Sequence, residues 1–246
     1  MHPISISNLT FSYKNRKIFD HAQLRLEQNT LSGILGCNGA GKTTLFDILC
    51  GLRQAPSAHV SVPRNDLTYL SQTVWVPPAL RMREVFHMIN ALTSNNILKE
   101  DDIFSKLYSW APGLAIRFQD IWHKKSAVCS YGEIRCFFTF SLIINPTGLI
   151  VLDEPTAGVD PEFRHYIWMG LEQARREGAT LLISSHNTDE IARHCDFFHM
   201  ISQHKLERFE DEEQFKQHFM ARTLDEAFIN ANTLPLPPAC RRDYEE

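Results

Sequence analysis

The segment from residue 36 to residue 43 holds the residues with the clearest capacity for chemistry. It reads GCNGAGKT and matches the pattern GxxxxGK[ST]. Its glycines let the backbone wrap closely around a chain of phosphates, with amide N–H groups turned inward, and the positive end of a following helix faces the same anion. In this pattern the Lys42 ammonium reaches the β- and γ-phosphates and the Thr43 hydroxyl helps to hold Mg²⁺. The segment therefore predicts a nucleotide site.

A pair of carboxylates provides a second chemical feature. Asp153 and Glu154 directly follow the apolar segment Leu149–Leu152. Asp153 is placed to hold the shell of Mg²⁺ through water, and Glu154 is placed to polarise an attacking water as a general base. Strands often end in acidic turn residues, so this pair alone does not indicate a site. The phosphate loop in the same chain makes a functional role for the pair the stronger interpretation.

The elements that must position these groups alternate between strands and helices. Ala22, Leu24 and Leu26 alternate with polar residues, which is typical of a half-buried strand, and residues 4–11 make a plausible partner strand. A strand at 31–35 precedes the phosphate loop and its helix. The alternation resumes with strands at 148–152, 180–184 and 196–202 and with helices at about 161–177 and 187–194. The pattern predicts an α/β fold with a P-loop NTPase core, in which a mainly parallel sheet joins an N-terminal antiparallel β part.

Between Pro77 and Pro146 the sequence pattern changes from alternating strands and helices to segments that look helical. We predict one domain over residues 1–230, in which 1–76 and 146–230 form the nucleotide-binding core and 77–145 form an inserted helical subdomain. Residues 231–246 are rich in proline and charge, and we expect them to form a loose C-terminal tail.

Composition narrows the class of protein. The formal net charge of −4 over 246 residues gives no electrostatic attraction to nucleic acid. The longest apolar-rich run, Cys136–Ile144, is too short to cross a bilayer, and the N-terminus does not read as a signal peptide. We expect a cytosolic chain whose six cysteines are free thiols. A cluster of His194, Cys195, His199 and His204 lacks the tight spacing of metal sites.

With these motifs in place, the chain resembles the ABC ATPases from about residue 4 to residue 230. Tyr13 in FSYKNRK matches the aromatic residue that stacks on adenine, and Gln72 in TYLSQ matches the Q-loop glutamine that touches Mg²⁺. Residues 129–133 (CSYGE) fall where the family carries its LSGGQ signature, residues 157–160 (AGVD) match the D-loop, and His186 matches the switch histidine.

The resemblance implies ATP and Mg²⁺ as cofactors, and it implies a role for each matching residue. The catalytic residues are Glu154, His186 and Lys42. The ATP-binding residues are Tyr13, Asn38, Gly39, Ala40, Gly41, Lys42, Thr43, Thr44, Gln72, Ser130, Gly132 and Asp160. The Mg²⁺ site comprises Thr43, Gln72 and Asp153.

The signature segment departs from the family pattern. Cys129, Tyr131 and Glu133 replace Leu, Gly and Gln, and Cys136 stands where a basic residue often follows. Ser130 and the amide of Gly132 remain available to meet the γ-phosphate held by an opposite subunit. Because Lys42, Glu154 and His186 are also intact, a hydrolysing subunit is favoured over a degenerate one.

The resemblance further implies a homodimer and a separate integral-membrane permease, which would place the chain at the cytoplasmic face of the membrane. The segments at 156–171, 184–196 and 223–229 look like those of ATPases that serve ABC-2-type exporters. One alternative is a soluble ABC ATPase acting on ribosomes or nucleic acid, but such proteins carry a second core or long coiled coils. Another is a P-loop enzyme of a different class, such as a small-molecule kinase. The ordered Gln72, Ser130 to Gly132 and His186 argue against it.

Overall fold

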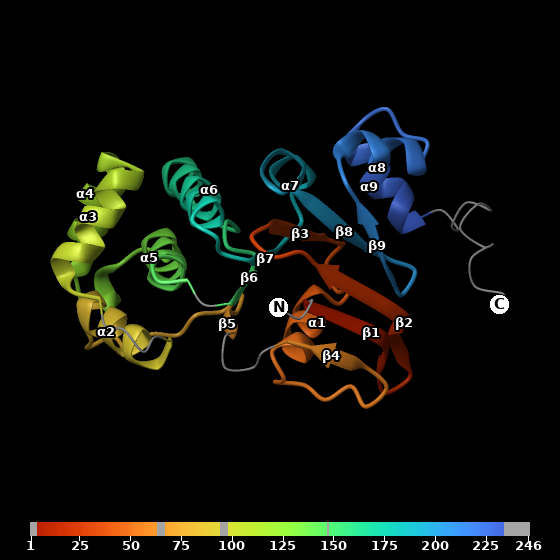
Figure 1. Ribbon diagram of the computed structural model, residues 1–246, viewed down its shortest axis with the longest axis horizontal. Coiled ribbons are helices and arrows are strands. Elements are labelled where there is room, and N and C mark those ends of the chain that lie inside the picture. Colours follow the sequence, from red (N-terminus) through yellow and green to blue (C-terminus); the bar gives the residue numbers. More distant parts are fainter. Residues whose placement is uncertain (1–3, 63–66, 94–97, 147, 234–246) are drawn as a thin grey trace. The chain divides into compact units, whose positions relative to one another are not determined.

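The computed structural model describes residues 4–62, 67–93, 98–146 and 148–233 (Figure 1). The chain divides into two compact units. The first unit comprises Met1–Glu27, Ser32–Val62 and Ser184–Glu246, and the second comprises Gln28–Leu31 and Pro63–Ile183. The predicted boundaries of the core and the helical subdomain stay predictions. The predicted tail lies outside the described residues from 234 onward.

The first unit contains a three-stranded antiparallel sheet in the order β2-β1-β4. Its strands are β1 (Ile4–Tyr13), β2 (Arg16–Leu26) and β4 (His59–Ser61). The β1–β2 register places Ile4 opposite Leu26 and Leu9 opposite Ala22. These four side chains are buried, as expected when one face of an antiparallel pair packs on a core. The predicted antiparallel N-terminal part is therefore confirmed.

The rest of the first unit surrounds a parallel pair of strands. β3 (Leu31–Leu35) pairs parallel with β8 (Phe197–Ser202), which pairs antiparallel with β9 (Lys205–Phe209). The helices of this unit are α1 (Lys42–Leu49), α7 (Thr188–His194), α8 (Glu212–His218) and α9 (Leu224–Thr233).

The second unit combines buried parallel strands with most of the helices. Its strands lie in the order β5 (Leu67–Leu70), β6 (Leu149–Asp153) and β7 (Leu181–Ser185), and β5 pairs parallel with β6. Its helices are α2 (Met82–Thr93), α3 (Glu100–Trp110), α4 (Pro112–Trp122), α5 (Tyr131–Ile143) and α6 (Pro161–Arg176). The predicted α/β class, with a mainly parallel sheet and added helices, is confirmed.

Aromatic side chains hold the helices of the second unit together. Phe118 of α4 stacks on Phe137 of α5 with ring centroids 4.7 Å apart, and Trp122 lies 5.1 Å from Phe86 of α2. Gly170 lets α6 approach α5, since a Cβ there would meet Phe140 at 2.4 Å. These aromatic contacts and the close approach at Gly170 frame α5, which carries the signature segment.

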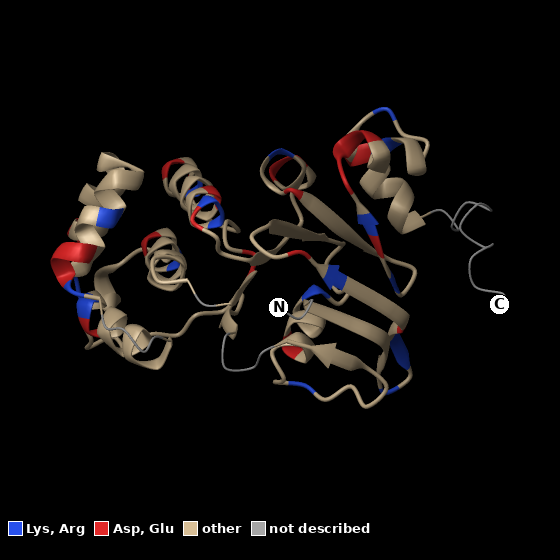
Figure 2. Cartoon of the chain, in the orientation of Figure 1, with Lys and Arg blue, Asp and Glu red and all other residues tan. Residues whose placement is uncertain are grey.

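Acidic residues in the first turns of α3, in the second unit, and of α8, in the first unit, complement the positive ends of these helices (Figure 2).

Candidate functional site

The phosphate loop of the first unit is preformed. Gly39 and Gly41 have φ angles of 79° and 115°, in the left-handed region that favours glycine. The amide of Ala40 donates to the carbonyl of Cys37 at 3.0 Å, and α1 begins at Lys42. The Lys42 Nζ, on a side chain that is largely buried, donates to the carbonyl of Gly36 at 2.8 Å. The Lys42 ammonium thus reaches across the loop to its first residue, which is the position expected of a group that binds phosphate oxygens.

Tyr13 lies near this loop, at the end of β1. Its hydroxyl is 3.3 Å from the Thr44 Oγ1 on α1, and its ring remains 40% exposed. The Arg53 guanidinium lies 5.0 Å from the ring centroid, a distance at which a cation is attracted to an aromatic face. The structure therefore brings together the predicted adenine-stacking residue and the predicted phosphate-binding helix.

The first unit also holds His186 and a contact that the sequence did not reveal. His186 is exposed and lies between β7 and Asn187, the N-cap of α7. The Arg16 Nη2 donates to the carbonyl of Gly39 at 3.0 Å, which fastens the β1–β2 turn to the phosphate loop. Arg16 lies 23 residues before Gly39, and no motif marks that pairing.

His194, Cys195, His199 and His204 do not form a group that could hold a metal ion. His199 is buried in β8, where burial and then the charge of Arg208 lower its pKa to about 3. Across the described part of the chain, no group of three or more His, Cys, Asp or Glu side chains could hold a metal ion.

The acidic pair of the second unit stands at the end of β6. Asp153 is 1% exposed and Glu154 is 5% exposed. Glu154 has a φ of 53°, which costs a residue with a Cβ roughly 1–2 kcal/mol. Strained backbone of this kind clusters at functional sites. The strained backbone at Glu154 is therefore consistent with a functional role for this residue.

The signature segment begins α5 with a complete capping box. The Ser130 Oγ accepts from the amide of Glu133 at 3.1 Å, and the Glu133 carboxylate accepts from the amide of Ser130 at 2.7 Å. The Ser130 hydroxyl still has its own proton to donate. The substitution of Gln by Glu in the signature therefore keeps the helix start and leaves a donor for a phosphate.

Signature and D-loop residues pack together within the second unit. A Cβ on Gly132 would meet the Asp160 Oδ2 at 3.3 Å, and a Cβ on Gly158 would meet the Tyr131 ring at 3.4 Å. The Asp160 carboxylate caps α6 by accepting from the amides of Glu162 and Phe163. The Tyr131 ring thus lies against Gly158 of the D-loop and is 51% exposed. It does not occupy the space beside Gly132.

Gln72 follows β5 and is exposed, and its carbonyl oxygen meets a residue that the sequence did not single out. That residue is Arg135, whose guanidinium contacts the backbone of Ser71, Gln72 and Asp153. Cys136 stands where a basic residue often follows the signature, and Arg135 precedes it by one position.

Glu133 and Lys124 form an ion pair at 2.5 Å beside the signature. Burial opposes the ionisation of Glu133, but the bonds from Lys124 and from the Ser130 amide outweigh it and lower the pKa of Glu133. A depressed carboxylate pKa stabilises the fold above the unfolded pKa, and this stabilisation is lost as the pH falls through the folded pKa. We expect Glu133→Gln to lower the free energy of unfolding by about 1 kcal/mol at pH 7, allowing for the exposure of Lys124.

Denaturant unfolding of both proteins between pH 7 and pH 3 checks this expectation, because the difference in stability should shrink once the pH falls below the unfolded pKa of about 4.5 and be lost as the pH passes through the lower folded pKa. Glu162→Gln is the matched control, since its pair with Arg117 is nearly half exposed on both sides. A gap for Glu133→Gln that stays constant with pH would contradict the assignment.

Comparisons with known proteins agree with this geometry. A family model described as ABC transporter matches residues 19–157. The protein McbF of Escherichia coli is 32% identical, covering 87% of this chain and 88% of its own length. The tungstate uptake system ATP-binding protein TupC of Peptoclostridium acidaminophilum is 32% identical over 78% of this chain and 91% of its own. The Nod factor export ATP-binding protein I of Rhizobium etli is 26% identical over 80% of this chain and 64% of its own length.

A solved structure of the ATP-binding subunit of an ABC transporter has the same fold, with a TM-score of 0.80 at 19% identity over 94% of this chain and 99% of that one. The chain belongs to the ABC transporter family, whose ATP-binding domain hydrolyses ATP to power transport. Among the described residues, no helix is long and apolar enough to span a membrane.

Proposed function

We propose that this chain binds MgATP through the residues assigned above, hydrolyses it as a homodimer, and drives a separate membrane permease, for export. The observation that carries the proposal is the preformed phosphate loop, in which a buried Lys42 already spans to Gly36. The acidic pair that ends β6 supplies the matching carboxylates.

The donor set suits Mg²⁺. Thr43, Gln72 and Asp153 offer a hydroxyl, an amide oxygen and a carboxylate, and hard oxygen donors are what Mg²⁺ prefers. When bound, the ion balances charge on the β- and γ-phosphates. These three residues would hold it.

Residues of the chain itself bind the nucleotide and carry out the proton transfer. Amides of the phosphate loop and Lys42 hold the β- and γ-phosphates, and Tyr13 stacks on the base. Glu154 accepts a proton from the water that attacks the γ-phosphorus in line, and His186 contacts the same phosphate. The bond from the γ-phosphorus to the bridging oxygen breaks, and ADP is the leaving group. Ser130 and the Gly132 amide act on the ATP held by the second copy, so hydrolysis requires two chains. Product release then lets the dimer reopen.

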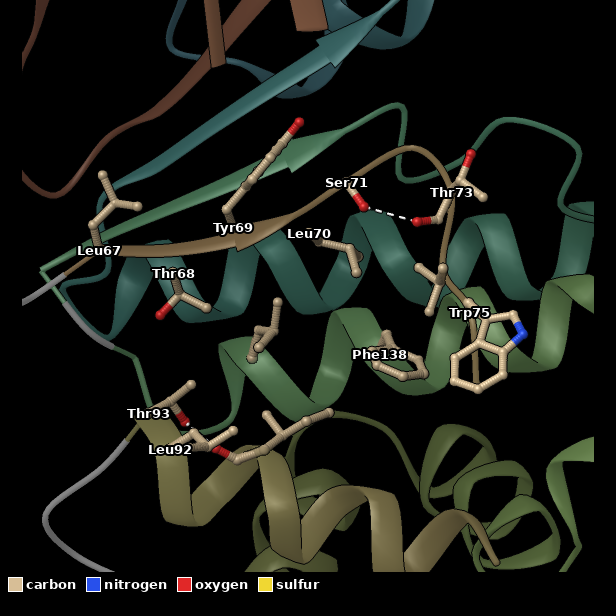
Figure 3. Close-up of a pocket in the computed structure, with 13 residues that line it drawn as sticks. Leu67, Thr68, Tyr69, Leu70, Ser71, Thr73, Trp75, Leu92, Thr93 and Phe138 are labelled. Atoms are coloured by element: carbon tan, nitrogen blue, oxygen red, sulfur yellow. Dashed lines mark hydrogen bonds between the residues drawn. The ribbon is translucent and has the colours of Figure 1, made fainter. Parts of the chain in front are cut away.

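A groove in the second unit offers a place for the permease. It has a volume of about 440 Å³ and is lined by β5, Ser71, residues 73–75, α2 and α5 (Figure 3). Leu92 and Trp75 on its rim are 85% and 78% exposed, which is unusual for large apolar side chains. Gln72 lies between Ser71 and Thr73, and both of these neighbours line the groove. An amphipathic segment of a permease would bury these side chains and act on the Q-loop.

The partner proposal is tested by purifying the tagged chain from detergent-solubilised membranes of its native host and identifying what accompanies it by mass spectrometry. We expect a membrane protein with several spans. Leu92→Glu should lower its recovery at least about tenfold, because a buried charge without a partner costs several kcal/mol. Ile116→Glu is the matched control, since Ile116 is 59% exposed on α4 and does not line the groove.

Thermal unfolding of both variants confirms that they fold. Equal recovery of the membrane protein with Leu92→Glu and Ile116→Glu would remove the groove from the interface. Recovery of ribosomes or nucleic acid without a membrane protein would overturn the transporter function.

Export is the direction that the Nod factor export relative and the exporter-like segments at 156–171, 184–196 and 223–229 support. The name of TupC describes uptake, so direction needs its own measurement. Transport by the reconstituted complex, with ATP supplied only outside inverted vesicles, should carry substrate into the lumen. Movement out of the lumen would identify an importer.

A further inference from the structure

The guanidinium of Arg135 is buried in the second unit, on the helix that begins with the signature segment. Its residue is 1% exposed. Nη1 donates to the carbonyl of Ser71 at 2.6 Å and lies 3.4 Å from that of Gln72, and Nη2 donates to the carbonyl of Asp153. One planar group therefore joins α5 to the ends of β5 and β6.

The acceptors of Arg135 lie where the paired strands β5 and β6 end. The parallel register pairs Leu70 with Leu152, and Ser71 and Asp153 directly follow these residues, where the ladder stops. The guanidinium carries five N–H donors in a rigid plane, so it can satisfy both strands at once.

A cation is an expensive choice for this task. Removing a charged group from water is costly, and Arg135 is almost completely buried. A neutral amide could serve the carbonyls at a smaller desolvation cost. The charge therefore has a use beyond packing, and it lies where the acidic pair leaves β6.

We propose that Arg135 is a positioning residue that fixes Gln72 and Asp153 relative to one another and ties both to the signature helix. The inference rests on the proposed function, in which Gln72 and Asp153 serve Mg²⁺ and α5 presents Ser130 and Gly132 to the opposite ATP. Any displacement of α5 then moves the backbone of the Q-loop and of the acidic pair together, because one side chain holds all three.

The test compares Arg135→Met, which removes every donor, with Arg135→Lys, which keeps the charge and some of the bonds. For Arg135→Met we expect kcat to fall roughly 10- to 100-fold and the half-saturating Mg²⁺ concentration to rise about tenfold. KM for ATP should stay within about twofold, because the phosphate loop is untouched. Arg135→Lys should recover part of both losses.

Amide hydrogen exchange provides a readout that needs no activity. In Arg135→Met, residues 71–76 and 153–157 should exchange faster, whereas β3 should not change. Ser141→Ala is the matched control: it lies on the same helix and loses a buried bond from its Oγ to the carbonyl of Phe137. It should lower the melting temperature without altering kcat, the Mg²⁺ requirement or exchange at 71–76 and 153–157.

Two results would overturn the proposal: a variant Arg135→Met that only loses stability, as Ser141→Ala does, or one with faster exchange but unchanged kcat and Mg²⁺ requirement. Absence of Mg²⁺-dependent hydrolysis in the unaltered chain would instead refute the proposed function. The exchange measurement would then decide alone whether Arg135 holds the two strand ends.

Discussion

Replacing Glu154 by Gln should abolish most ATP turnover while leaving ATP binding intact. A positioned general base contributes roughly 10²- to 10⁴-fold to a rate, and the amide of Gln cannot accept the proton of the attacking water. Gln has the shape of Glu and meets the same backbone φ of 53°, so the fold should be unaffected. We expect kcat to fall at least about 100-fold and MgATP to trap closed dimers, which size-exclusion chromatography would detect.

Asp153→Asn separates the two carboxylates of the pair. If Asp153 serves the Mg²⁺ shell, its variant should need more Mg²⁺ for half-saturation, whereas Glu154→Gln should not. Glu172→Gln on α6 provides a control for a Glu-to-Gln change away from the acidic pair. Normal turnover in Glu154→Gln would remove Glu154 from its role, whatever the other variants do.

Much of the fold could be predicted because its signals are local. The period-two alternation of Ala22, Leu24 and Leu26 predicts β2, and the apolar run before Asp153 predicts β6. The predicted strand ends differ from the observed ones by about one residue, as at β7 and β8. The motif that marks the phosphate loop is likewise local, since it lies within eight consecutive residues.

Other elements escaped prediction for physical reasons. β9 follows a tight turn at Gln203 and His204, both with positive φ, and neither residue is the Gly or Asn that normally marks such a turn. Arg135 looks like any polar residue on a helix in the sequence, and its three acceptors lie 18 to 64 residues away. Contacts with backbone carbonyls leave no pattern in side-chain types, so only the fold can show them.

Gly39 and Gly41 of the phosphate loop both have positive φ angles, but the space around their Cα atoms differs. A Cβ on Gly41 would lie 2.6 Å from the Ile18 Cγ2 and 3.0 Å from the Phe19 Cζ, and both of those side chains are buried. A Cβ on Gly39 would meet only the Arg16 Nη2 at 3.4 Å, the end of a flexible, exposed side chain.

Gly41→Ala should therefore combine backbone strain with overpacking, each worth about 1–3 kcal/mol, and shift the first turn of α1. Gly39→Ala should show the strain alone. We expect Gly41→Ala to weaken binding of a fluorescent ATP analogue at least about tenfold, because the amides that face the phosphates move together with Lys42. Denaturant unfolding should show the larger loss of stability in the same variant. Equal losses of affinity and stability in the two variants would mean that left-handed backbone, and not the wall formed by Ile18 and Phe19, makes glycine necessary at position 41.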